Sequence, residues 1–231
     1  MHQGPPLLVL PNAWDVASAR AFASIPGCAA IATSSAAVAR SLGWEDGEQA
    51  PVEEMLRVVE RIVAAVEIPV TADLEAGYGD PPRTAAAALA VGAAGMNLED
   101  SRADVQLPLE EQVAIIRAVR VAAPELVLNA RVDVFLGGSA DVAEAVERGN
   151  AYLAAGADCV YPIFLGDPAL VKQFVDGVGG HVNVNAGRSG ATLAELGALG
   201  VSRISAGGGI FFATLNTVKE AAEAMFGAAS A

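Results

Sequence analysis

Cysteine and positive charge are both scarce in this chain. Its 231 residues include only Cys28 and Cys159, too few for a disulfide framework, so a reducing, cytoplasmic location is expected. The 14 lysines and arginines are outnumbered by 27 acidic residues. The net charge of −13 argues against a nucleic-acid partner, which requires a basic face. It does not exclude a small anionic substrate held by local cations or a metal ion.

Long apolar runs are absent too, although 53% of the residues are hydrophobic and the mean hydropathy is +0.42. Charged residues, proline or glycine interrupt every run before the roughly 18–20 residues that a membrane span requires. The first residues, MHQGPP, lack the basic segment of a signal peptide, and the following LLVL is too short for its apolar segment. We therefore expect no membrane partner, and we expect the surplus apolar surface to be buried in a core and between subunits.

The chain does contain a regular alternation of short Val-, Ile- and Leu-rich runs with longer stretches of helical spacing. The short runs predict strands at Leu7–Leu10, Ala29–Thr33, Ile68–Asp73, Gly95–Leu98, Leu126–Ala130, Cys159–Pro162, Val182–Asn185 and Ser202–Ser205. The longer stretches predict helices at Ala13–Ser24, Pro51–Val66, Pro82–Val91, Leu109–Ala122, Ala140–Ala155, Pro168–Val178, Ala191–Leu199 and Ala213–Phe226. Glycines follow several of these helices, as expected at helix ends.

Eight strands, each followed by a helix, is the pattern of an α/β protein with a (β/α)8 TIM barrel. Strands that are apolar without alternation suit parallel strands buried on both faces. An open doubly wound sheet is the alternative, but eight such units in 231 residues leave no room for a second domain. We therefore predict a single barrel domain over residues 1–231, with 213–226 as a C-terminal helix.

Acids and amides collect where the predicted strands end, and barrel enzymes place their active sites at these ends. Asp73 and Glu75 are two residues apart, so an extended backbone would aim both to one side. Asp46 and Glu99 would join them, and such a cluster needs a proton or a cation that Arg131 alone does not supply. With oxygen ligands only, Mg²⁺ fits far better than Zn²⁺, and Mn²⁺ is the alternative ion. The competing interpretation is that some of these acids only cap helices.

Two other segments at this rim carry weaker signals. The TSSAA segment, with Ser34, Ser35 and Ala36, offers backbone amides and hydroxyls that can hold a carboxylate, although Ser-rich turns are common. The glycines around Tyr78 predict a tight turn that would also let a substrate approach the backbone.

Taken together, these motifs resemble the isocitrate lyase/phosphoenolpyruvate mutase superfamily, especially its short, carboxyvinyl-carboxyphosphonate phosphorylmutase-like members. The resemblance runs in order through LVLPNAWDVASAR, AIATSSAAVARSLGWEDGE, IPVTADLEAGYGD, GMNLEDS, LNARVDVFL, AYLAAGADCVYP and LAELGALGVSRIS. It implies Asp73 as the direct Mg²⁺ ligand, with Asp46 and Glu99 binding through water. Glu75 stands where many members have aspartate, so it is expected to bind through water or to shift the ion slightly.

The resemblance also implies how a substrate is held. Ser34 and the backbone amides of Ser35 and Ala36 would grip a pyruvyl carboxylate, and Arg131 would face the 2-oxo or enolate oxygen. Asn185 completes the expected substrate-binding set. The implied function is a Mg²⁺-dependent lyase that cleaves a C–C bond of a small 2-oxo or 2-hydroxy dicarboxylate, oxaloacetate- or alkylmalate-like, through an enolate.

Departures from the superfamily narrow this expectation. The Lys-Lys-Cys-Gly-His motif of isocitrate lyases is absent, and both cysteines lie at the starts of strands, away from the chemistry. The segment after the fourth strand has Arg102 but no lysine, and Asp104 would repel a phosphonate, so P–C mutase or hydrolase chemistry is the alternative. The resemblance does not identify which residue donates the proton.

Arg131, Glu99 and Tyr78 form the expected catalytic set. Tyr161 and Arg102 are further candidates for the proton donor, whereas His2 and His181 lie too far from the rim.

Many superfamily members exchange their last helix between subunits, which makes residues 213–226 a candidate for exchange in a homodimer or homotetramer. A barrel that binds a metal or an oxo-acid without turning it over is the competing function. A third interpretation is that the rim acids are only solvated.

Overall fold

The computed structural model describes residues 7–103 and 105–229. In it the first barrel strand extends beyond the predicted Leu7–Leu10 and is divided at Pro11 into two pieces. The first piece, β1 (Leu8–Leu10), pairs with β11 (Arg203–Ser205), and the second, β2 (Asn12–Ala13), pairs with β3 (Ile31–Thr33). Proline has no N–H for a sheet ladder, so the strand can change neighbours there. Because one strand borders both edges, the sheet closes into a barrel.

The closed sheet has nine parallel strands in the order β1-β11-β10-β9-β8-β5-β4-β3-β2. The remaining members are β4 (Val70–Asp73), β5 (Gly95–Leu98), β8 (Val127–Val132), β9 (Cys159–Pro162) and β10 (His181–Asn185). Counting the two pieces of the first strand as one, these are the eight predicted strands, with ends shifted by a few residues. The predicted TIM-barrel fold is confirmed.

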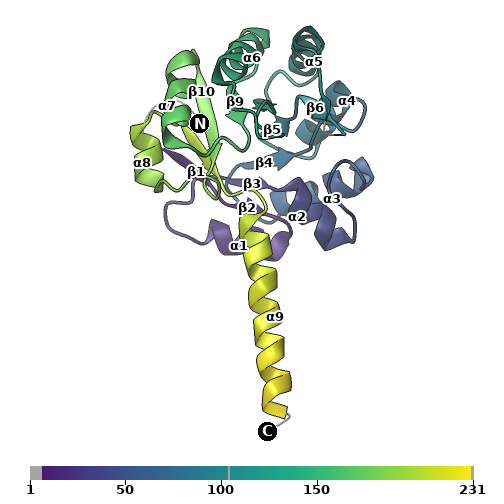
Figure 1. Cartoon of the computed structure of the whole chain (residues 1–231). Coiled ribbons are helices and arrows are strands. Elements are labelled where there is room, and N and C mark those ends of the chain that lie inside the picture. Colours follow the sequence, from purple (N-terminus) through teal and green to yellow (C-terminus); the bar gives the residue numbers. More distant parts are fainter. Residues whose placement is uncertain (1–6, 104, 230–231) are drawn as a thin grey trace.

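Helices surround this barrel (Figure 1). They are α1 (Val16–Ala23), α2 (Ser35–Leu42), α3 (Val52–Val63), α4 (Pro81–Ala90), α5 (Leu109–Ala122), α6 (Val142–Ala155), α7 (Pro168–Gly177), α8 (Leu193–Ala198) and α9 (Gly209–Ala229). In α3, Met55, Val59 and Ile62 are buried at helical spacing, so one apolar face packs on the strands. The left-handed Gly156 ends α6, as its sequence predicted.

Two elements were not predicted from the sequence. Helix α2 lies in the segment after β3, where no helix was predicted; its N-cap is Ser34, and the left-handed Gly43 ends it. A small antiparallel hairpin, β6 (Ser101–Arg102) with β7 (Val105–Gln106), follows β5. Both elements lie at the C-terminal ends of strands, where they shape the mouth of the barrel.

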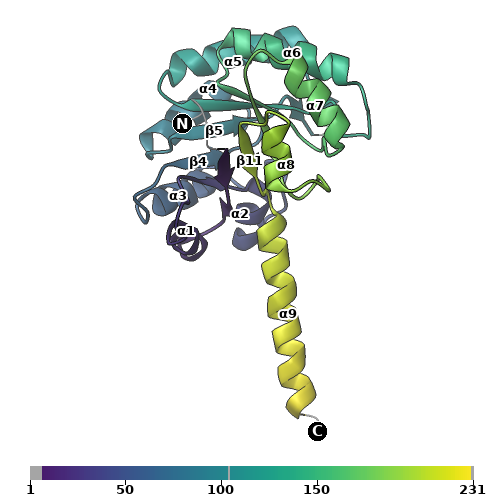
Figure 2. The same ribbon diagram turned by 90° about the vertical axis from the view of Figure 1, so that its left-hand side faces the viewer.

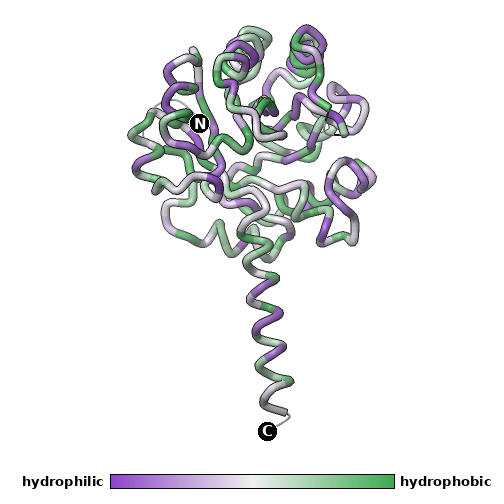
Figure 3. The backbone as a smooth tube through the Cα atoms, in the orientation of Figure 1, coloured by the Kyte–Doolittle hydropathy of each residue, from purple (hydrophilic) through white to green (hydrophobic). Residues whose placement is uncertain are grey.

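Helix α9 leaves the barrel instead of packing along it (Figures 1 and 2). Its start is anchored because Phe211 is buried and stacks edge-on against Trp14, with the ring centroids 5.2 Å apart. From residue 213 to residue 227 the helix is exposed. Apolar and polar residues alternate along it (Figure 3), and no helix among the described residues is long and apolar enough to cross a membrane.

Candidate active site

A cavity of about 250 Å³ opens at the C-terminal mouth of the barrel. Its lining includes seven residues predicted from the sequence to bind metal or substrate: Ser34, Ser35, Ala36, Asp46, Asp73, Arg131 and Asn185. Ser205, Phe164 and Phe212 also line it and were missed. No sequence pattern marked these two aromatics, because their place depends on how the loop after β9 and the start of α9 fold over the barrel.

Asp73 ends β4 with both carboxylate oxygens engaged. The backbone N–H of Ser35 donates to Oδ2 at 2.9 Å, and Asn97 Nδ2 donates to Oδ1 at 3.2 Å. Asn97 is itself fixed, since its Oδ1 accepts from Asn129 Nδ2 at 2.8 Å and more distantly from Arg203 Nη2 at 3.5 Å. This chain of amides along the barrel interior holds the Asp73 carboxylate in one orientation.

The predicted carboxylate-binding segment is the N-terminus of α2. Ser34 caps the helix by accepting from the Ala37 N–H, and the helix dipole favours negative charge at this end. The Ser35 N–H, which was expected to hold a substrate carboxylate, donates to the Asp73 carboxylate instead. The helix end and the acid thus form one connected wall of the cavity.

Glu75 does not continue the strand, so the predicted alternation with Asp73 does not hold. Its φ of 50° is left-handed, and its buried carboxylate turns toward the loop before α3. Oε1 accepts from the Tyr78 hydroxyl at 2.7 Å, and Oε2 accepts from the Glu48 N–H at 2.6 Å. Burial raises the pKa of Glu75 to about 7; the Tyr78 hydrogen bond opposes this, while the charges of Asp46 and Asp73 add to it.

A second cavity of about 270 Å³ adjoins the first, and Asp46 and Arg131 line both. Glu75, Glu99 and Arg102 line only the second. Although the two predicted ligands Asp73 and Glu75 are close in sequence, they therefore face different chambers. Asp46 stands between them, and burial together with the charge of Asp73 raises its pKa.

Arg131 is held between two acids at the junction of these chambers. Its Nε and Nη2 donate to the two oxygens of Asp133 at 2.5 and 2.9 Å, and its Nη1 contacts Glu99. Burial alone would lower the pKa of Arg131, but the charges of Glu99 and Asp133 outweigh it and raise the pKa. Burial raises the pKa of Glu99 well above its usual value, although Arg131 opposes this. The guanidinium is therefore charged and fixed in orientation.

The candidates for the proton donor have different surroundings. Tyr161 is buried in the first cavity beside Asn185, whose Nδ2 lies 3.4 Å from the Tyr161 hydroxyl. Tyr78 donates to Glu75, and its pKa is raised by burial and by the charge of Glu75. Cys159 is buried at the start of β9 and His181 lies at the start of β10, both away from the mouth as expected, whereas His2 falls outside the described residues.

The acids at this site offer only oxygen ligands, which Mg²⁺ prefers. Within the described ranges, no three Asp, Glu, His or Cys side chains are arranged to hold an ion unaided. Mg²⁺ is usually bound through only one or two carboxylates plus water and substrate, so a complete protein cage is not required. The charge of Asp73 also raises the pKa of Asp46, Glu75 and Glu99, so a cation beside Asp73 would relieve the repulsion among all four acids.

Comparison with known proteins agrees with this geometry. The phosphoenolpyruvate phosphomutase family model matches residues 1–226. An uncharacterized protein of Mycobacterium tuberculosis is 37% identical over 226 residues, which are 97% of this chain and 86% of that protein. The 2,3-dimethylmalate lyase of Eubacterium barkeri is 30% identical over 213 residues, or 84% of this chain and 73% of the lyase.

A solved structure from Burkholderia cenocepacia, described provisionally as a phosphonomutase, is 38% identical to this chain. It superposes with a TM-score of 0.89, covering 96% of both chains. The chain therefore belongs to the phosphoenolpyruvate mutase/isocitrate lyase superfamily.

Proposed function

We propose that this protein is a Mg²⁺-dependent lyase that cleaves a C–C bond of a small 2-oxo or 2-hydroxy dicarboxylate. The observation that carries the proposal is the position of Arg131, which lines both cavities at their junction. A substrate lying across this junction would have one carboxylate near the N-terminus of α2 and its remaining part beside Arg102. The relationship to a 2,3-dimethylmalate lyase supports a substrate of this size.

The residues of the chain have separate tasks in this reaction. Ser34 and the N-terminal end of α2 bind the first carboxylate of the substrate. Arg131 donates to the oxygen on which negative charge develops as the bond breaks, and the Glu99 and Asp133 carboxylates keep it aligned. Asp73, with Asp46 nearby, would hold Mg²⁺, which neutralises the acid cluster and polarises the 2-oxo group. Tyr78, Tyr161 and Arg102 are the candidates for moving the proton.

A panel of substrates tests the proposal. Pyruvate or keto-acid release is measured from oxaloacetate, 2-methylisocitrate, 2,3-dimethylmalate and phosphonopyruvate, with Mg²⁺ and with EDTA. We expect Mg²⁺-dependent cleavage of a C–C substrate above the rate of an Asp73→Ala control. Turnover of phosphonopyruvate alone would favour P–C chemistry. Oxalate binding that depends on Mg²⁺ without any turnover would favour a barrel that only binds.

We also propose that α9 is exchanged between two copies of the chain. An apolar cavity of about 420 Å³ lies beside β1 and β11, between the end of α1 and the start of α8, with Val9, Ile25 and Leu193 among its lining residues. All three are substantially exposed in the single chain. In a (β/α)8 barrel this is where the helix after the last strand packs, yet α9 points away (Figure 2). The α9 helix of a second copy would fill it.

The molar mass in solution tests this exchange. Light scattering should give a dimer or a tetramer for the full chain and a monomer for the Leu215→Asp/Val218→Asp variant, because both side chains are exposed apolar groups on α9. The matched control is Lys219→Asp on the same helix, which should keep the oligomer. A monomeric full chain would refute the exchange without affecting the proposed reaction.

A further inference from the structure

Arg203 lies inside the barrel as a buried cation with no carboxylate of the described residues in ion-pair contact. Its residue is 2% exposed, and among the described residues it forms no ion pair. Its Nη2 lies 3.5 Å from Asn97 Oδ1, and its Nε–H has no acceptor among the described residues. Burying an uncompensated charge is costly, so such groups are usually paired. Burial lowers the pKa of Arg203, and the charges of Cys159, Tyr161 and Asp73 only partly oppose this.

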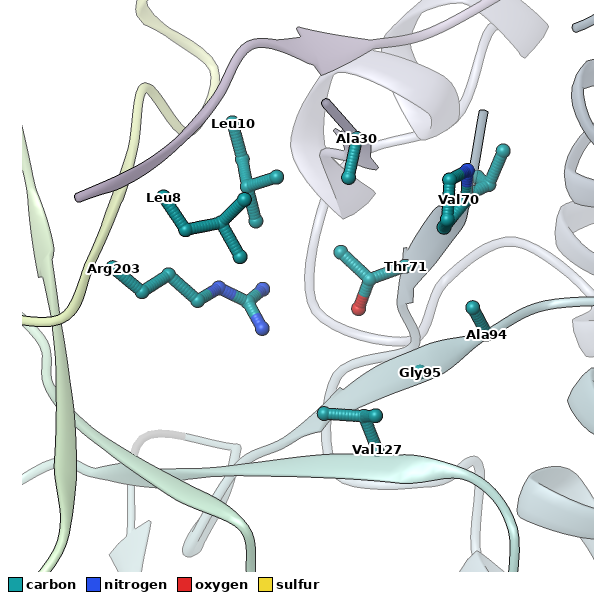
Figure 4. Close-up of a pocket in the computed structure, with 10 residues that line it drawn as sticks. Leu8, Leu10, Ala30, Val70, Thr71, Ala94, Gly95, Val127 and Arg203 are labelled. Carbon is teal, nitrogen blue, oxygen red and sulfur yellow. The ribbon is translucent and has the colours of Figure 1, made fainter. Parts of the chain in front are cut away.

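A small cavity faces this guanidinium at the N-terminal end of the barrel. Figure 4 shows the side chain of Arg203 reaching into the space between Leu8, Thr71, Gly95 and Val127. The Thr71 hydroxyl also lines this space and has no hydrogen-bond partner. Two unsatisfied donors, one of them charged, therefore meet in one cavity whose walls are otherwise apolar.

The cavity limits what can bind there. The space open to the centre of a water-sized particle is about 20 Å³, which leaves room for a single small ion. A water molecule would accept from both donors but would place no negative charge beside Arg203. An occupant that satisfies both donors and the charge is a monatomic anion.

We propose that one chloride ion binds between Arg203 and Thr71 at the end of the barrel opposite the active site. The site is separate from the substrate cavities, since neither Arg203 nor Thr71 lines them. Chloride would accept from the free Nε–H of Arg203 and from the Thr71 hydroxyl. The ion serves the fold by neutralising the buried arginine.

Crystallography with bromide gives the direct test. Crystals of the full chain grown in sodium bromide should show an anomalous peak in this cavity, within contact distance of Arg203 and Thr71. Absence of the peak at full bromide concentration, with ordinary water density in its place, would overturn the proposal.

Thermal unfolding in solution tests the same site. The melting temperature is followed as sodium chloride replaces sodium gluconate at constant ionic strength, because gluconate is too large for the cavity. At ten times its Kd, chloride should lower the unfolding equilibrium constant about elevenfold, which corresponds to roughly 3–6 °C for a chain of this size. Equal melting curves in the two salts would contradict the proposal.

Three variants assign any chloride effect to this cavity. Arg203→Met should remove the chloride dependence. Thr71→Val keeps the side-chain shape and should raise about tenfold the chloride concentration that gives half of the stabilisation. It is the deciding variant if Arg203→Met does not fold. The control is Arg148→Met, which removes another largely buried arginine that does have acids beside it, Asp100 and Glu144. It should lose stability but keep the full chloride dependence, and loss of that dependence would point to a nonspecific salt effect.

Discussion

Replacing Asp133 by Asn tests whether the orientation of Arg131 controls the reaction. The Asp133 side chain is fully buried and accepts from both Nε and Nη2 of Arg131, while Ser101 also donates to it. Asn has almost the same shape but replaces one acceptor oxygen with an NH₂ group. One of the two bonds to Arg131 is therefore lost, and a donor faces a donor.

The size of the effect follows from the lost bond. A hydrogen bond between charged groups contributes about 1.5–3 kcal/mol. If Arg131 acts mainly on the charge that develops during bond cleavage, this loss appears in kcat as a fall of about 10- to 160-fold, because each 1.36 kcal/mol is a factor of ten. KM should change little, since the carboxylate of the substrate is bound elsewhere, at the N-terminus of α2.

The assay is steady-state cleavage of whichever substrate of the panel is turned over, with Mg²⁺ affinity measured in parallel. The matched control is Asp158→Asn, which breaks an arginine–aspartate pair with Arg120 on the outside of the barrel and should leave kcat unchanged. A folded Asp133→Asn protein with kcat within twofold of wild type would refute the role of this clamp. If no compound is turned over, Mg²⁺-dependent oxalate affinity provides the same comparison.

Three further predictions address the metal, the loop and the cysteines. Asp73→Ala should abolish Mn²⁺ binding measured by electron paramagnetic resonance; unchanged affinity would mean that the rim acids are only solvated. Gly77→Ala should cost more than about 2 kcal/mol in urea unfolding, because φ is +92° and the new Cβ would lie 2.6 Å from a backbone atom of Pro81. At Gly79, where φ is +78°, an added Cβ would have no atom within 4 Å, so Gly79→Ala should lower the free energy of unfolding by only about 1 kcal/mol. Equal losses for the two variants would contradict the clash at Gly77. Because burial raises the pKa of Cys159 to about 12, its thiol stays protonated at pH 8 and should react with a thiol reagent only after unfolding; rapid labelling of the folded protein would refute this.

Much of the barrel could be predicted because its strands are short, apolar and separated by helices of regular spacing. Gly95–Leu98 and Cys159–Pro162 were predicted with their observed ends, since each apolar run is bounded by turn residues. Helix α2 was missed because it is only eight residues long and begins almost directly after β3. What establishes this helix is the cap at Ser34 and the packing of Val38 and its neighbours against the barrel.

The candidate site likewise has features that the sequence could predict and features that it could not. The identity of its acids could be predicted, because Asp73 and Glu99 follow strands whose ends must meet at one rim. The role of Glu75 could not be inferred from spacing, since its left-handed backbone turns the carboxylate toward Tyr78 and Glu48. The contact between the Ser35 N–H and Asp73 spans 38 residues, and only the closed barrel brings them together.

The sequence alone thus determined the class of fold, the rim that carries the polar residues and the oxygen-only chemistry of the acids, because all three depend on local pattern and residue type. Only the tertiary structure decided how the acids are divided between two chambers, what holds Arg131 and where α9 points. It also placed Arg203 in the barrel interior with no carboxylate of the described residues in ion-pair contact. These features depend on contacts between residues far apart in the chain, which no local pattern encodes.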